Sequence, residues 1–137
     1  MGVKISGKFV GGLNTKMTHK LSDQIIFTDP PLDNGGEGKS FSPTDLLATA
    51  AGSCVMTIMA IYAKKNSIDL SGMFCDVEKH MSKEPPRRVS QIDIEVYLPK
   101  KLPLVQREAL ESVGSSCPVL LSLNPDVVVR KLYRYEV

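Results

Sequence analysis

The feature that most constrains this chain is an uncharged, largely apolar run over residues 46–63. The preceding segment SPTD, residues 42–45, offers a capping serine, a proline suited to the first helical position and a carboxylate near the capping-box position. Lys64 and Lys65 follow at the carboxyl end, where cations are favourable. The pattern predicts one long helix that is apolar on every side.

This run is just long enough to raise the possibility of a membrane-spanning helix. Much of it is Ala, Thr, Ser and Gly, it has no aromatic belt, and strand-like segments flank it. We therefore expect no membrane insertion. A helix that is apolar all round needs more cover than one small sheet in a chain of 137 residues offers. We expect a second subunit to supply that cover, which predicts a homodimer.

Alternating apolar and polar residues on both sides of the helix predict strands. The expected strands lie at 3–9, 17–21, 24–28, 73–78, 92–98 and 127–135. Helical spacing predicts a second helix at 104–113, and Pro118 starts a short third one. The result is an α+β fold in the order β-β-β-α-β-β-α-α-β, with antiparallel strand pairing, in a single domain over residues 1–137.

Composition narrows the function classes. The chain has 17 basic and 15 acidic residues, a balance too even for the basic face that nucleic-acid binding needs. Lys4 and Lys8 interrupt the amino-terminal segment, so it lacks the apolar core of a signal peptide. The chain has three cysteines, an odd number, and they are widely spaced. This pattern is typical of reduced thiols in the cytoplasm.

The cysteines differ in their local chemistry. Cys117 precedes Pro118 at a helix start, where free N–H groups stabilise a thiolate, although a small buried residue or a cap explains the position equally well. Cys54 lies mid-helix, where apolar surroundings raise a thiol pKa, so reactivity there would require a cation or donor from elsewhere in the fold. Cys75 alternates with its strand neighbours and is expected to be a small core residue.

The histidines, His19 and His80, lie on expected strands, and neither stands at a metal-ligand spacing from a cysteine or from the other. We therefore expect no metal and no cofactor. A cysteine hydrolase with Cys117 as nucleophile and a histidine as base is permitted by the helix start, but the positions of the histidines give it little support.

Two segments together carry a family resemblance: FSPTDLLATAAGSC, which ends at Cys54, and CPVLLSL, which begins at Cys117. With the PPRR turn and alternating strand between them, they resemble the OsmC-like family of osmotically induced and organic-hydroperoxide-resistance proteins, from about residue 9 to the end. The resemblance implies an intertwined homodimer in which sheets from both subunits wrap each central helix. In peroxidase members, the cysteine matching Cys54 attacks the peroxide to give a sulfenic acid, and the one matching Cys117 condenses with it to a disulfide, which a thiol reductant reverses.

The sequence also departs from the peroxidase members. Those members carry a glutamate at the position of Thr44 and an arginine from the amino-terminal region; here Asp45 is merely adjacent and no arginine precedes Arg87. Lys16, His19 or Arg87 could supply the missing positive charge. The resemblance implies a thiol-dependent reductase of hydroperoxides in oxidative-stress defence, and the departures favour an alternative, a noncatalytic dimer that binds an apolar small molecule in its interface pocket.

Overall fold

The computed structural model describes residues 1–137 and has the predicted order of strands and helices, with one additional 3-10 turn, η1 (Leu32–Asn34). Contacts within the chain divide it into two compact units, Met1–Leu46 and Leu47–Val137. The boundary lies in the first turn of the long helix α1 (Pro43–Lys65). That the whole chain behaves as one domain stays a prediction.

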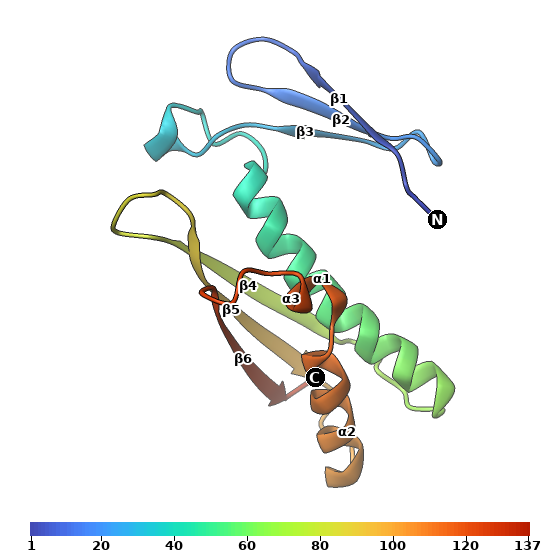
Figure 1. Cartoon of the computed structure of the whole chain (residues 1–137). Coiled ribbons are helices and arrows are strands. Elements are labelled where there is room, and N and C mark those ends of the chain that lie inside the picture. Colours follow the sequence, from blue (N-terminus) through green and yellow to red (C-terminus); the bar gives the residue numbers. More distant parts are fainter. The chain divides into compact units, whose positions relative to one another are not determined.

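The first unit holds a three-stranded antiparallel meander (Figure 1): β1 (Ile5–Phe9), β2 (Thr15–His19) and β3 (Ile25–Thr28). Gly11 and Gly12 have positive φ angles in the β1–β2 turn, a conformation that favours glycine. Strand β2 ends at His19, two residues before the expected end at Leu21. The reason is a tight turn in which Asp23, at φ 57°, donates its backbone N–H to the carbonyl of His19.

The sheet of the first unit has no apolar core of its own. Large apolar side chains on its strands are exposed, Phe9 to 74% and Phe27 to 54%. The buried positions of this unit are the polar residues Thr28, Asp29 and Ser42. Since an isolated small sheet needs a covered apolar face to be stable, these strands require cover from outside their own unit.

Helix α1 begins with the predicted capping box. The backbone N–H of Asp45 donates to Ser42 Oγ over 3.1 Å, and that of Ser42 donates to Asp45 Oδ2 over 2.8 Å. One face of α1 is buried within the chain, whereas Leu47 and Ile61 on other faces are exposed. By length and composition α1 could cross a membrane, and core helices of soluble proteins share those properties. Helix α1 is therefore a core helix on one face, and its other faces are not covered by the chain itself.

The second unit contains a sheet in the order β4-β5-β6: β4 (Phe74–Met81), β5 (Val89–Leu98) and β6 (Val128–Tyr135). Strands β4 and β5 are antiparallel, as predicted, but β6 runs parallel to β5. The prediction of antiparallel pairing throughout is therefore wrong for the last strand. Helices α2 (Leu104–Ser115) and α3 (Pro118–Leu121) form the long crossover that parallel neighbours require.

The two faces of this sheet differ sharply. One face packs against the helices (Figure 1) and carries four fully buried residues of β5: Ile92, Ile94, Val96 and Leu98. Helix α1 approaches β4 closely at Gly52, where an added Cβ would lie 2.4 Å from Val77 Cγ2. Helix α2 approaches α1 at Gly114, where an added Cβ would lie 2.9 Å from Met59 Cε. The opposite face is open to solvent and mixes charged side chains, such as Glu78 and Asp93, with exposed apolar ones, such as Phe74 and Leu132.

Candidate functional site

Helix α1 carries Cys54 in its middle. Cys54 is half-buried and packs against the apolar core of the second unit, directly before the fully buried Val55. Since the backbone groups around it are engaged in the helix, no free helix end lies next to its sulfur. This agrees with the expectation that Cys54, taken on its local surroundings, is a core position.

Cys117 lies between α2 and α3, as the residue that precedes Pro118 at the start of α3. It is fully buried, with a relative exposure of 0%. Its backbone is extended, with φ −60° and ψ 131°, and its carbonyl accepts the backbone N–H of Leu121. The short helix thus holds the cysteine backbone in place at its first turn.

The two cysteine side chains lie close enough to interact, although they are far apart in the sequence. Burial is the largest cause that raises the pKa of Cys117, and the neighbouring Cys54 thiol raises it further. The backbone N–H groups of Leu120 and Val119 lower the pKa but do not outweigh those causes. Of the two interpretations that the sequence left open for Cys117, the structure favours the small buried residue, because desolvation and a neighbouring thiol outweigh the stabilisation of a thiolate.

The third cysteine, Cys75, lies on β4 and faces α1. Its sulfur is 3.3 Å from the position that a Cβ at Gly52 would occupy. Burial, followed by the charge of Asp76, raises the pKa of the Cys75 thiol. These contacts fit the expected small core residue.

A model of the OsmC-like protein family matches residues 36–130, a segment that contains both Cys54 and Cys117. This chain belongs to the OsmC-like family. No functionally curated protein matches it.

Solved structures agree with that membership. A protein from Psychrobacter arcticus 273-4, described as an osmotic stress induced and detoxification response protein, is 36% identical, with 96% of this chain and 94% of that chain covered and a TM-score of 0.88. The organic hydroperoxide resistance protein OsmC from Legionella pneumophila is 18% identical over 98% and 97% of the two chains, at a TM-score of 0.78. OhrB of Bacillus subtilis, an organic hydroperoxide resistance protein, is 16% identical over 98% of both chains, at 0.71. The predicted family and fold class are confirmed.

In this OsmC-like chain, Thr44 and Asp45 both take part in the start of α1. The hydroxyl of Thr44 lies 3.2 Å from Ser42 Oγ, and Asp45 is the carboxylate of the capping box. The stretch of α1 from Asp45 to Cys54 rises about 14 Å, so neither residue neighbours the sulfur on its own helix. Their predicted supporting roles stay predictions.

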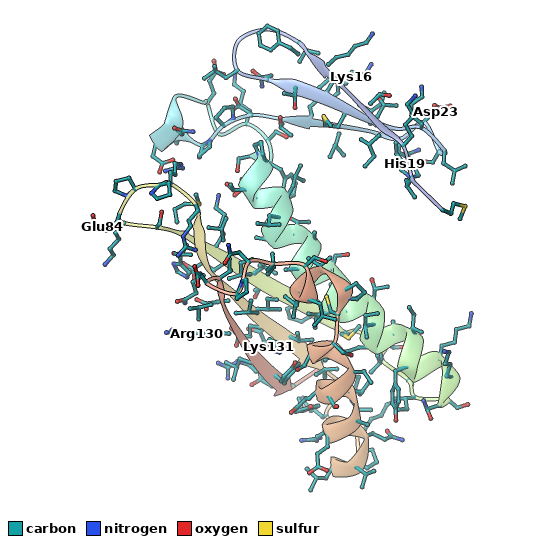
Figure 2. The ribbon with its side chains drawn as sticks, viewed as in Figure 1. Lys16, His19, Asp23, Glu84, Arg130 and Lys131 are labelled. Carbon is teal, nitrogen blue, oxygen red and sulfur yellow. The ribbon has the colours of Figure 1, made fainter.

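The predicted sources of positive charge lie on other elements. Lys16 and His19 are on β2 of the first unit (Figure 2), where His19 Nδ1 lies 2.6 Å from Ser22 Oγ. Arg87 is exposed in the loop between β4 and β5 of the second unit. Whether any of them acts on Cys54 stays a prediction.

Sequence reasoning missed a group of polar side chains on the open face of the β4-β5-β6 sheet. Glu78, His80 and Asp93 present ligand atoms that all lie within 4.8 Å of one another. Glu78 lies opposite Asp93 in the antiparallel register, and His80 Nε2 lies 2.8 Å from Asp93 Oδ2. The signal was present as strict alternation in both strands, but only the register shows that these residues meet.

Proposed function

We propose that this protein is a thiol-dependent reductase of organic or inorganic hydroperoxides that serves in oxidative-stress defence. The observation that carries the proposal is the proximity of the Cys54 and Cys117 thiols, which interact at an apolar core. Relatives of the same fold that are named for organic hydroperoxide resistance give it further support. No cofactor is part of the proposed reaction.

The roles of the two sulfurs follow from their surroundings. A thiolate, not a thiol, attacks a peroxide. Burial and the adjacent Cys54 raise the pKa of Cys117, so its sulfur is poorly suited to attack a peroxide at neutral pH. We therefore assign the attacking role to Cys54 and the resolving role to Cys117.

The proposed reaction balances in three steps. The Cys54 thiolate attacks one peroxide oxygen, the O–O bond breaks, and the leaving alkoxide takes a proton to give an alcohol and a sulfenic acid. The Cys117 thiol then attacks the Cys54 sulfur, which forms the disulfide and releases water. An external thiol reductant supplies two electrons and two protons that restore both thiols.

The first step needs a cation or donor near Cys54. We propose that Lys16, His19 or Arg87 provides it. Thr44, at the position of the family glutamate, and Asp45, next to it, would have a supporting role. The rate of iodoacetamide labelling of Cys54 against pH, in a Cys117→Ser background, tests each candidate. The substitution that removes the activating group shifts this profile to higher pH, and substitutions of the others leave it unchanged.

Mass spectrometry of protein treated with cumene hydroperoxide tests the reaction itself. We expect an intramolecular disulfide between Cys54 and Cys117, and a dimedone-reactive sulfenic acid on Cys54 in the Cys117→Ser variant. Cys75→Ser is the matched control and should behave as the parent. A disulfide that involves Cys75, or no oxidation of Cys54 in either protein, would exclude the mechanism.

The same experiment separates the alternative function. A noncatalytic dimer that binds an apolar small molecule would consume negligible peroxide. It would also keep its affinity for that ligand in a Cys54→Ser, Cys117→Ser double variant.

We further propose that the protein is a cytoplasmic homodimer. The exposed apolar side chains of the first unit and the open side of α1 support this, because a second copy can cover both. Sedimentation velocity should give about twice the 15.0 kDa chain mass. Phe27→Lys should shift the protein toward monomer, whereas Val105→Lys, an exposed apolar residue on α2, should not. A 15.0 kDa species at every concentration would exclude the dimer.

A further inference from the structure

We propose that Glu78, His80 and Asp93 form a binding site for a divalent transition-metal ion, Zn²⁺ in the first instance, on the open face of the β4-β5-β6 sheet. The site lies on the face opposite the helices and does not include either cysteine of the proposed redox pair. It is therefore independent of the proposed function.

The ligand atoms are already gathered. One imidazole nitrogen and two carboxylate oxygens lie within 4.8 Å of one another. Tetrahedral zinc ligands at bond lengths of about 2.0–2.2 Å lie roughly 3.4 Å apart. Side-chain rotations that move the ligand atoms by about an ångström would bring the three atoms to that spacing, with no change in the strands.

The strands fix the side chains that carry these atoms. Glu78 and His80 are two positions apart on β4 and therefore point to the same face. Asp93 lies opposite Glu78, and Gln91 lies opposite His80, on β5. The Gln91 amide donates to both oxygens of Asp93, over 2.8 Å and 2.9 Å, and so orients this carboxylate as the outer partners of metal ligands do.

The charge pattern of this face also favours a cation. The register sets Asp76 opposite Glu95 and Glu78 opposite Asp93, and like charges that face each other across strands are unfavourable. Arg134 forms an ion pair with Glu95 and so relieves the first pair. Arg130, opposite Asp93 on β6, relieves part of the second, and a cation between Glu78 and Asp93 would relieve it further.

The site is open on its outer side. A hollow of about 500 Å³ is lined by Glu78, Asp93 and Arg130, and another of about 550 Å³ by His80 and Gln91. Water can therefore complete the coordination of an ion held by three protein ligands. Arg130 on β6 (Figure 2) lies opposite Asp93 in register, and its charge opposes the cation, so we expect it to weaken the binding.

The donor set also selects among metals. Mg²⁺ and Ca²⁺ prefer six or more oxygen ligands, whereas an imidazole with two carboxylates suits the later first-row ions. We therefore expect the site to bind Zn²⁺ more tightly than Mg²⁺ or Ca²⁺.

Histidine NMR on the full chain with added zinc chloride tests the proposal, because the chain has only two histidines. The imidazole signals of His80 should shift at one equivalent per chain, while those of His19 stay in place. In calorimetric titrations, His80→Ala and Asp93→Asn should weaken zinc binding at least tenfold and Gln91→Ala by about tenfold. Asp76→Asn removes the same charge from the same face outside the ligand set, and it should change the affinity less than twofold.

Three outcomes would overturn the proposal. Zinc could leave the His80 signals in place or shift both histidines equally. Asp76→Asn could weaken binding as much as Asp93→Asn, which would indicate diffuse attraction to an acidic face. Binding could persist in His80→Ala and vanish after alkylation of the cysteines, which would place the ion on thiols.

Discussion

The close approach of α1 to β4 predicts the cost of adding one methyl group at Gly52. In Gly52→Ala the new Cβ would lie 2.4 Å from Val77 Cγ2 and 3.3 Å from Cys75 Sγ. Val77 is β-branched and sits on a strand, so its side chain cannot turn away cheaply. Overpacking of this depth costs about 3 kcal/mol, and the better helix propensity of alanine returns about 1 kcal/mol. We expect a net loss of about 2 kcal/mol, or about 7 °C in Tm for a chain of this size.

Gly114→Ala is the matched control. Its new Cβ would meet Met59 Cε at 2.9 Å, and that atom is the mobile end of a flexible side chain. We expect its unfolding free energy to stay within about 1 kcal/mol of the parent, because the neighbour can move and helix propensity improves. Val77→Ala in the Gly52→Ala background should recover at least about 0.5 kcal/mol as a coupling energy.

Urea unfolding measures these differences, and one fixed protein concentration keeps any contribution from association equal for all variants. The reasoning is refuted if Gly52→Ala is as stable as the parent, or if both glycine substitutions cost the same.

Three further predictions concern single side chains. Ser42→Ala should lose about 1 kcal/mol of stability through the missing cap, whereas Ser53→Ala on the exposed side of the same helix should change the urea midpoint little. Tyr135→Phe should lose about 1.5 kcal/mol at neutral pH, because the hydroxyl donates to Glu111 over 2.5 Å. Burial and that bond raise the pKa of Tyr135 above its ordinary 10.0. The stability that Tyr135 contributes is therefore fully present below pH 10.0 and is lost as the pH rises above that value. The difference between the urea midpoints of parent and variant should accordingly be large at neutral pH and shrink at higher pH. Cys117 should react with iodoacetamide more slowly than in urea-unfolded protein below pH 9.0, because burial raises its pKa; equal rates by mass spectrometry would contradict its burial.

Local sequence was sufficient for most of the fold. The start of α1 followed from a serine and a carboxylate in capping positions, and the structure has that reciprocal pair. The alternation of apolar and polar residues located the strands but could not give their direction, because it is the same in parallel and antiparallel strands. The parallel pairing of β6 with β5 depends on how α2 and α3 cross the sheet, which is a tertiary property.

The candidate sites show the same limit. Local reasoning treated Cys54 as core, and only the family resemblance paired it with Cys117; the structure brings them together through the packing of three helices. The helix start at Cys117 suggested a favoured thiolate, but burial was not readable from its neighbours and it decides the direction of the pKa. Glu78 and Asp93 looked like ordinary solvent-facing residues until the register set them opposite each other.

The uncovered sheet of the first unit bears on how the molecule is made. Residues 1–46 leave the ribosome before residues 47–137, yet their apolar strands find nothing within that segment to fold against. In the proposed homodimer, amide protons of β1, β2 and β3 should therefore gain protection late, and dilution should expose them again. The ordering of this stretch would then depend on protein concentration as well as on its sequence.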